Sequence, residues 1–561
     1  MLFITVLTCF QVYSQQSYPQ NYFRSPLDIP LVLSGTFGEL RNNHFHSGID
    51  IKTKQREGLK VYAVADGYVS RIKVALWGYG KVIYITHNNG YTSVYAHLNR
   101  FGKGIQEYVK KVQYKKENYQ TGNIYLKPDD IIVKKGQVIG YSGSTGGYVA
   151  PHLHFELRDS QTEKIINPLL FGLNIKDTLT PRIRKVIAYA LDDDSRINQS
   201  NKNQTIHFKK ESPGNYISNR ISASGEIGFG LQVDDRLNNA LNRNGVYSIE
   251  MTVNGKRVYY HDLETFSFRE SKYINLLVDY PFYYKYKKRI QKTHIVKGNK
   301  LTIYKDLINK GKIDIKNGMN YTVNIIATDI AGNKSTLKIP VIGKKSNTIF
   351  TQFKDSTAYK IKATEFNKFQ KNTVTIAFPK NTFYNDIFLD FDVENDSIVT
   401  IHKPAIPLDK KFTLTFDVSK YSESEKERLF IANVNHKKYA NYQLTKKKKN
   451  KFYTTTKTLG KYTLIFDNQK PKIYNLNFKD QQWITNKDQI RVNISDYGSG
   501  IKSYRATIDG EWILMEYNLK KKKLIYNFSD KKLVGSKHSF KIVVSDNVGN
   551  TNTLSATFYK K

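Results

Sequence analysis

The segment "PHLHFELRD" at residues 151–159 alternates between polar and apolar side chains. Successive side chains of a β-strand point to opposite faces, so a strand here places His152, His154 and Glu156 on one face. The apolar side chains between them form the other face, which is expected to be buried. Two histidines on one face of a strand can converge on a single ion, so this segment predicts half of a metal site.

The other half is predicted by "NNHFHSGIDIKT" at residues 42–53. His46 and Asp50 stand four positions apart across Ser47-Gly48, where the glycine lets the chain bend. The carboxylate then enters on the following strand. Neutral imidazoles, one carboxylate and an open position for water make a catalytic zinc site, and no thiolate takes part in it.

The distribution of histidine supports one site in this region. Six of the 12 histidines fall between residues 44 and 154, and these residues make up about one fifth of the chain. A lone histidine in a β protein is usually a packed or exposed polar residue. His44 and His87 are interpreted in that way.

Residues 20–175 are predicted to form one antiparallel β unit with short turns. Turn-forming pairs and glycine-rich stretches separate its strand-like runs. The expected pieces are two strands over 58–74 joined at Asp66-Gly67, a hairpin over 81–98 that turns at Asn89-Gly90, and a short strand before a glycine-rich loop over 133–147.

An insertion at residues 104–128 interrupts this β unit. Apolar residues spaced for one helix face, from Ile105 to Val112, predict a helix over 104–120. It is expected on the rim of the sheet, where such an insertion can narrow or cap a groove.

The whole chain is predicted to be dominated by β-structure. An antiparallel β-sheet domain with a small helical insertion carries the metal site, and Ig-like β-sandwich modules follow it. Two later stretches each begin with proline and an alternating strand, and each ends in strand, D-x-x-G-N turn and strand. The predicted divisions are a signal peptide at 1–14, the metal-site domain at 20–175, a β-sandwich with an insertion at 180–345, a β-rich domain at 350–468 and an Ig-like β-sandwich at 469–561.

The first residues predict export. Residues 2–13 form a short apolar run that fits a secretory signal peptide, with cleavage after Ser14. The single cysteine, Cys9, would be lost with this segment, so no disulfide is expected. Lipid attachment at Cys9 is the alternative, for which Thr8 is a poor preceding residue. No later stretch is long and apolar enough for a transmembrane helix.

The chain is strongly basic, with a net charge of +39 from 88 Lys+Arg against 49 Asp+Glu. The charge is spread along the chain, as a lysine-rich composition produces, and its small clusters are expected at solvated loop tips. No basic face with interleaved aromatic residues and no nucleic-acid motif accompanies it, so nucleic acid is not an expected partner. Anionic polymers of a cell envelope fit an exported basic protein better.

The motifs "FHSGID", "YAHL" and "PHLHFE", in this order and at these spacings, resemble the lysostaphin/LytM family of zinc endopeptidases. The stretch "VKKGQVIGYSGSTG" resembles the strand and glycine-rich loop that precede the family's last motif. The resemblance covers roughly residues 30–172. Two longer features, "WGYGKVIYITHNNGYTSVYAHL" and "INPLLFG", look like versions from envelope proteins of diderm bacteria such as the Bacteroidetes. The tail resembles bacterial Ig-like modules only loosely.

The resemblance implies a role for each motif residue. His46, Asp50 and His154 would be the zinc ligands, and His152 would be the general base on the metal-bound water. His97, in "YAHL", would help to activate water or steady the oxyanion. Zinc lowers the pKa of bound water to about 7 and polarises a carbonyl, and a neighbouring neutral imidazole can take the proton.

The resemblance therefore implies an exported zinc-dependent metalloendopeptidase, a peptidoglycan hydrolase that cleaves peptide cross-links of the bacterial cell wall. It would act in the periplasm or cell envelope, with outer-membrane association and secretion both open. The alternative is a non-catalytic envelope protein that binds or directs another cell-wall hydrolase. The presence of all five functional positions favours the enzyme. The bond cleaved, the ligand of the tail and the oligomeric state are not predicted.

Overall fold

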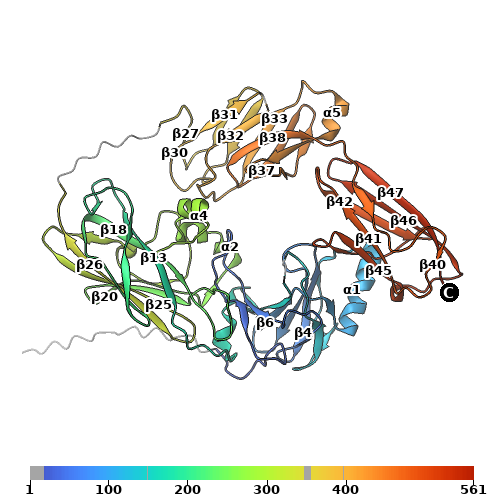
Figure 1. The fold of residues 1–561 in the computed structure, drawn as a ribbon, viewed down its shortest axis with the longest axis horizontal. Helices are drawn as coiled ribbons and strands as arrows, with labels where there is room; N and C mark the ends of the chain where they lie inside the picture. The colour runs from blue at the N-terminus through green and yellow to red at the C-terminus, as the bar shows by residue number, and fades with distance from the viewer. Residues whose placement is uncertain (1–17, 148–149, 347–355, 396, 437) are drawn as a thin grey trace, which may run out of the picture.

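The computed structural model describes residues 18–561 except 148–149, 347–355, 396 and 437. The predicted signal peptide and Cys9 lie outside the described residues. The chain is 45% strand and 8% helix, which confirms the predicted dominance of β-structure. In Figure 1 the sheets of the chain follow one another in a ring, and the last sheets lie beside the helix at residues 103–116. In the part of the chain described, no helix is long and apolar enough to cross a membrane.

A ten-stranded antiparallel sheet forms the first part of the chain. Its central strand β11 (His152–Asp159) lies between β2 and β6, and every side chain from His152 to Arg158 is buried. The order along the sheet is β1 (Leu33–Gly35), β2 (Ile49–Lys52), β11, β6 (Tyr91–Ala96), β5 (Lys81–His87), β4 (Gly67–Val74) and β8 (Gly122–Tyr125), with β9 (Ile132–Val133), β12 (Ile165–Ile166) and β21 (Thr265–Phe266) off this path.

One predicted hairpin is confirmed and another is wrong. Strands β5 and β6 pair as predicted, and Gly90 turns between them with a φ of +84°. The two strands expected on either side of Asp66-Gly67 belong to different sheets, because β3 (Lys60–Tyr62) pairs with β10 (Val138–Tyr141) and β4 pairs with β5. The Asp66 carboxylate instead accepts a 2.7 Å hydrogen bond from the Lys135 backbone, which ties the turn to the segment before β10.

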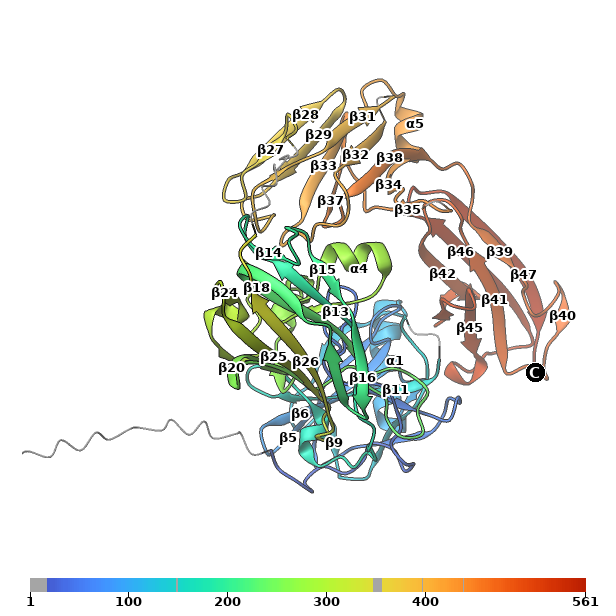
Figure 2. The same ribbon diagram turned by 60° about the vertical axis from the view of Figure 1, so that its left-hand side comes forward.

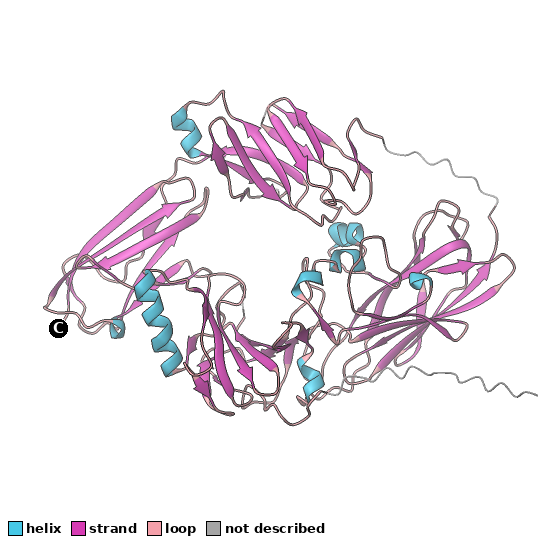
Figure 3. Ribbon diagram, turned by 180° about the vertical axis from the view of Figure 1, so that it is seen from behind, coloured by secondary structure: helices cyan, strands magenta, loops and turns pink. Residues whose placement is uncertain are grey.

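The predicted helical insertion is present as α1 (Lys103–Lys116). Its buried side chains are Ile105, Val109 and Gln113, spaced four residues apart on one face. The helix follows β7 (Arg100–Phe101) and lies between the first sheet and the last sheets of the chain (Figures 1 and 3).

Beyond residue 180 the chain forms further sheets, and each of the three stretches has its own buried apolar cluster. Residues 182–343 form a 13-stranded sheet, whose main path is β15 (Gln204–Ile206), β13 (Arg182–Ala190), β18 (Ile221–Asp234), β26 (Lys334–Gly343), β25 (Asn320–Thr328), β19 (Ser248–Val253), β20 (Lys256–Asp262) and β23 (Tyr304–Leu307).

The two later stretches each contain two main sheets (Figure 2), and the first of these stretches also contains the two-stranded sheet of β27 (Lys360–Ile361) and β30 (Ile387–Phe388). The first pair is β28 (Asn367–Lys371), β29 (Val374–Phe378), β33 (Phe412–Asp417), β37 (Lys451–Thr456) and β36 (Lys446–Lys448), with β31 (Phe391–Glu394), β32 (Ile398–Ile401), β38 (Gly460–Phe466), β34 (Leu429–Asn433) and β35 (Asn441–Tyr442). The last pair is β39 (Lys472–Tyr474), β41 (Gln489–Ser495), β45 (Lys523–Asn527) and β44 (Glu516–Asn518), with β40 (Gln482–Trp483), β47 (Thr551–Tyr559), β46 (Lys537–Asp546), β42 (Ile501–Ile508) and β43 (Glu511–Trp512).

The first sheet does not end at the predicted division near residue 175. Strand β21, from the second stretch, continues it by pairing with β12. The ring of Phe266 packs against Phe37 and Phe45, with centroids 4.8 and 5.1 Å apart. Three short helices follow, α2 (Phe268–Ser271), α3 (Ile274–Leu277) and α4 (Tyr280–Tyr286), within the stretch 180–345 for which the sequence predicted a β-sandwich with an insertion. The division into domains stays a prediction.

Candidate metal centre

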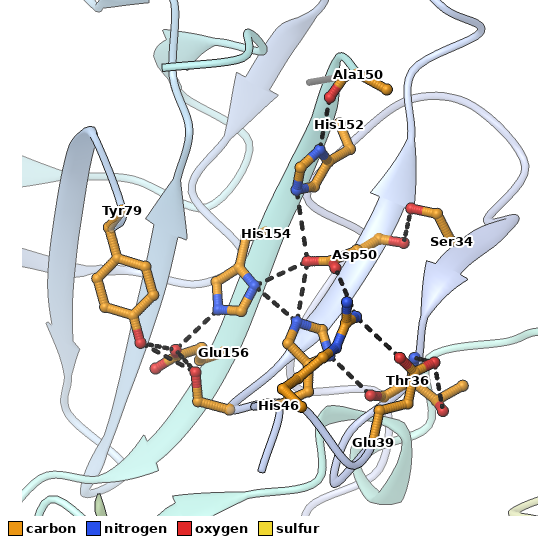
Figure 4. A network of polar contacts seen from close by, with 12 residues as sticks. Ser34, Thr36, Glu39, His46, Asp50, Tyr79, Ala150, His152, His154 and Glu156 are labelled. Atoms are coloured by element: carbon orange, nitrogen blue, oxygen red, sulfur yellow. Dashed lines mark hydrogen bonds and ion pairs between the residues drawn. The ribbon is translucent and has the colours of Figure 1, made fainter. Parts of the chain in front are cut away.

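Strand pairing brings the two halves of the predicted site together. Asp50 lies on β2 directly opposite His154 on β11, and His46 stands in the turn that leads into β2. One ligand atom from each of these residues lies within 4.8 Å of the others. All three side chains are buried, and Figure 4 shows them pointing toward one another.

In both His46 and His154, one ring nitrogen faces the site and the other contacts a protein acceptor outside it. His46 Nδ1 lies 2.8 Å from the Thr36 carbonyl oxygen, so it carries the hydrogen, and Nε2 faces Asp50 Oδ1 at 3.1 Å. His154 Nε2 lies 2.8 Å from Glu156 Oε1, and Nδ1 faces the same Asp50 oxygen at 2.9 Å. These outer partners fix the tautomer that each neutral ring adopts and direct its other nitrogen, the one that can bind a metal, into the site.

This donor set fits zinc. Two imidazole nitrogens and one carboxylate oxygen converge from separate elements, with a protein hydrogen bond holding the other side of each ring. Zinc prefers such nitrogen and oxygen ligands, and catalytic sites take three from the protein. Burial alone would lower the pKa of His154, but its hydrogen bonds to Asp50 and Glu156 raise it to about 9. The pocket therefore favours a cation, either a proton or a metal ion.

The remaining predicted residues, His97 and His152, lie beside this centre. The centroids of their rings are 4.8 Å apart, and His152 Nε2 lies 3.6 Å from Asp50 Oδ1. His152 Nδ1 hydrogen-bonds the Ala150 carbonyl at 2.9 Å, and His97 Nδ1 does the same with Thr145 at 2.9 Å. Burial lowers the pKa of His97 to about 3 and also lowers that of His152. Both imidazoles are therefore neutral at pH 7.

All five predicted residues thus meet in one cluster, and the two histidines set aside stay outside it. His44 is exposed and contacts the Asn42 carbonyl. His87 is buried in the sheet, where it hydrogen-bonds Ser93 Oγ at 2.7 Å.

A buried carboxylate behind His154 received no role from the sequence. Glu156 Oε1 accepts hydrogen bonds from Ser47 Oγ at 2.6 Å and from the Tyr79 hydroxyl, and it also contacts His154. Glu156 Oε2 accepts a hydrogen bond of 2.7 Å from Arg158 Nε. Burial would raise the pKa of Glu156, but Arg158 and His154 hold it well below its usual value. The alternation along β11 already placed Glu156 on the site's face, whereas nothing local points to Tyr79.

The site is nearly closed to solvent. The five predicted side chains are at most 6% exposed. Arg41 closes one side, with Nη2 3.4 Å from Asp50 Oδ2. Its approach requires a glycine at position 35, where a Cβ atom would lie 2.7 Å from that Nη2 and 2.8 Å from the Asp50 carboxylate. Arg41 also lines an outer cavity of about 680 Å³.

Comparison with known proteins confirms the resemblance seen in the sequence. Residues 44–114 match the model of Peptidase family M23, and residues 358–467 match that of a Zu5-like domain. The chain is 33% identical over 147 residues to the DD-carboxypeptidase/endopeptidase Mpg of Neisseria meningitidis serogroup B, which covers 26% of this chain and 25% of that protein. It is 34% identical over 155 residues to the murein hydrolase activator NlpD of Escherichia coli, which covers 28% of this chain and 32% of that one.

The chain therefore spans about a quarter to a third of the length of these curated relatives. Among solved structures, the catalytic domain of the antimicrobial peptidase lysostaphin from Staphylococcus simulans is 25% identical. The match covers 25% of this chain and 90% of that chain, with a TM-score of 0.19.

Proposed function

We propose that this chain is a zinc-dependent metalloendopeptidase that hydrolyses peptide cross-links of bacterial cell-wall peptidoglycan. The observation that carries the proposal is the convergence of His46, Asp50 and His154, with two further neutral imidazoles beside them. The match of residues 44–114 to a peptidase family supports it, as does an endopeptidase among the relatives.

The zinc ligands in this proposal are His46 Nε2, Asp50 Oδ1 and His154 Nδ1. When bound, zinc would supply a Lewis acid that polarises a peptide carbonyl and lowers the pKa of water. The Thr36 carbonyl and the Glu156 carboxylate hold the two rings in the tautomers that this binding needs.

His152 is assigned the general base. Its Nδ1 is held by the Ala150 carbonyl, so the other nitrogen is the one that takes a proton from the attacking water. His97 is held in the same tautomer by Thr145, and its low pKa keeps it neutral. Of the two roles that the resemblance offers for His97, the geometry supports help in activating water, because an oxyanion needs a hydrogen-bond donor.

A cell-envelope setting completes the proposal. The relatives include proteins whose names refer to murein and to cell division. A net charge of +39 would draw the chain toward anionic envelope polymers. We place its action in the periplasm or cell envelope, after export.

One observation favours a second candidate, a non-catalytic regulator that directs another cell-wall hydrolase. The five site residues are at most 6% exposed, so a peptide can reach them only after the surrounding residues move. A murein hydrolase activator is also among the relatives.

A single assay separates the candidates. The full chain, zinc-loaded or chelated, is incubated with purified sacculi, and mass spectrometry identifies the released peptides. The enzyme predicts peptide release that depends on zinc and falls in the His152→Ala variant. If the chain alone releases no peptide but increases the release by another hydrolase above that hydrolase's own level, the result contradicts the enzyme and supports the regulator.

A further inference from the structure

A second group of carboxylates lies outside the histidine cluster, where the chain enters the stretch formed by residues 182–343. Its first member is Asp329, in the D-x-x-G-N turn between β25 and β26. Asn333, the last residue of that turn, donates to both oxygens of Asp329, from its backbone nitrogen at 2.9 Å and its side-chain amide at 2.8 Å.

Two carboxylates from distant parts of the chain join Asp329. Asp235 directly follows β18, and Asp177 lies in the segment that leads from the first sheet into β13. One oxygen from each of the three lies within 4.8 Å of the others. Asp235 and Asp329 are each only 2% exposed.

Nothing in the described part of the chain neutralises this charge. No lysine, arginine or histidine there forms an ion pair with any of the three carboxylates. Asp235 Oδ1 is buried without a hydrogen-bond donor, and so is Asp177 Oδ2. Like charges at such distances repel strongly when they are partly removed from water. Burial and the neighbouring carboxylates raise the pKa of Asp235 to about 7, and burial raises that of Asp177 to about 6.

We propose that Asp177, Asp235 and Asp329 bind a divalent cation, and that this cation is Ca²⁺. A cation explains why a buried carboxylate oxygen is left without a donor inside the cluster. The ligands are all oxygen atoms, which hard cations such as Ca²⁺ and Mg²⁺ prefer, whereas zinc sites in proteins usually include nitrogen or sulfur ligands. Ligands from three separate segments suit Ca²⁺, because it accepts irregular geometry more readily than Mg²⁺.

The position of the cation gives it a structural role. Asp177 belongs to the connection between the first sheet and β13, whereas Asp235 and Asp329 belong to the second stretch. Asn333 also reaches the Asp177 carbonyl at 3.4 Å. A bound ion would fix the connection to the second stretch and so restrict how that stretch is oriented relative to the metal centre.

A similar cluster, formed by Asp467, Asp496 and Asp546 at the start of the last stretch, differs in the hydrogen bonds that its carboxylates accept. Asn550 there contacts Asp546 Oδ2 at 2.7 Å and the Asp467 carbonyl at 2.9 Å, as Asn333 does in the first cluster. Asp496, the third member, accepts from the Gly500 backbone at 2.6 Å, and Asp467 accepts from Ser499 at 2.7 Å. Among the described residues, no carboxylate oxygen of this second cluster is buried without a donor, whereas Asp235 Oδ1 and Asp177 Oδ2 are, so the proposal is limited to the first cluster.

Calcium binding to the full chain tests the proposal. The chain is stripped of calcium with EGTA and titrated with CaCl₂ by isothermal calorimetry, and MgCl₂ is used in a parallel titration. We expect Asp235→Asn to lose one equivalent of bound Ca²⁺ relative to the unaltered chain. Asp314→Asn should bind as the unaltered chain does, because Asp314 is exposed and pairs with Lys316 outside the cluster.

A second variant and a second measurement keep the proposal testable if Asp235→Asn does not fold. Asp177→Asn changes the less buried member, so it should fold even if Asp235→Asn does not, and it should weaken Ca²⁺ binding by more than about tenfold, since ligand charge sets calcium affinity. Ca²⁺ should also protect residues 172–181 from protease in the unaltered chain and not in either cluster variant. Equal Ca²⁺ stoichiometry and equal Ca²⁺ affinity in all folded variants overturn the site, and tighter binding of Mg²⁺ overturns its assignment to calcium.

Discussion

His46 Nε2 and His154 Nδ1 lie 3.1 Å apart, and the other nitrogen of each ring already contacts an acceptor. Two lone pairs at that distance repel each other unless a cation lies near both. Asp50 Oδ1 adds a negative charge within 3.1 Å of each nitrogen. Burial would raise the pKa of Asp50, but its contacts with the histidines hold it well below its usual value. The centre is therefore arranged for a cation before one arrives.

Substitution of the five site residues should separate ligands from bases. Loss of any one of His46, Asp50 and His154 removes one of three protein ligands, so each alanine variant should lose both zinc and peptidase activity. His152→Ala leaves all three ligands in place. It should keep near-stoichiometric zinc, while its rate falls by about 10²–10⁴-fold, the usual contribution of a general base. His97→Ala should behave in the same way.

Elemental analysis beside turnover, measured for every variant, checks these assignments together. His44→Ala is the matched control, since His44 is exposed and contacts only the Asn42 carbonyl among the described hydrogen bonds. A metal-free His152→Ala beside a zinc-loaded His154→Ala would reverse the roles assigned to this pair.

Glu156→Gln should weaken zinc binding without removing a ligand. Glu156 accepts the hydrogen of His154 Nε2, and an amide can donate to that nitrogen instead and so favour the wrong tautomer. Outer partners of this kind are worth about 10–100-fold in metal affinity. Competition with a chromogenic zinc chelator measures the change. Glu163→Gln is the control, because Glu163 also accepts from Arg158, at 2.8 Å, but does not contact a histidine. Equal affinities for the two variants would mean that Glu156 only balances the charge of Arg158.

The core of the site could be predicted because it depends on local geometry. Alternation along residues 152–157 placed two histidines and Glu156 on one face, and a turn at Gly48 placed His46 and Asp50 together. Both inferences need only the period of a strand and the reach of a short turn. Tyr79 escaped prediction because it reaches Glu156 across 77 positions of the chain, and no spacing rule describes such a contact.

The error at Asp66-Gly67 has a related cause. A turn-forming pair predicts a change of direction, but it does not predict which strand will be the hydrogen-bonding partner. Strand β3 found its partner in β10, more than 70 residues later, where Val61 lies opposite Gly140. The contact of residues 265–266 with β12 was equally invisible, because it joins two stretches that the sequence treated as separate domains.

Stability of the second stretch should fall in mild acid. His261 is fully buried, and its Nδ1 lies 2.8 Å from the Tyr259 hydroxyl oxygen. Burial lowers the pKa of His261 to about 3, so the unfolded chain binds a proton near pH 6.5 before the folded chain does. Protons therefore stabilise the unfolded state, and each pH unit lost between pH 6 and pH 3 should cost about 1.4 kcal/mol from this group.

Hydrogen exchange of the β20 peptides, followed in urea at several pH values, measures that slope. His261→Gln should reduce it, whereas His207→Gln should leave it unchanged, because His207 is exposed. An identical slope in His261→Gln and the unaltered chain would assign the acid sensitivity to other groups.

The last stretch of the chain should hold the helical insertion in place against the first sheet. Trp512 packs edge-on against Tyr114 of α1, with ring centroids 5.2 Å apart, and Lys110 pairs with Asp530. A cavity of about 270 Å³ lies between the same two parts and is lined by Thr145, whose carbonyl holds His97. Trp512→Ala removes a side chain that is only 9% exposed, a change worth about 3–5 kcal/mol in a packed core.

We expect Trp512→Ala to expose the segment at 104–120 to protease and to change which peptides are cut more than how fast the best one is cut, because segments at the rim of a site set access to it. Limited proteolysis and a panel of cross-linked muropeptides measure the two effects. Trp483→Ala is the matched control, since Trp483 is 53% exposed and stacks on Tyr559 of β47 rather than on α1. Unchanged cleavage of 104–120 together with unchanged selectivity would show that the insertion holds its position without the last stretch.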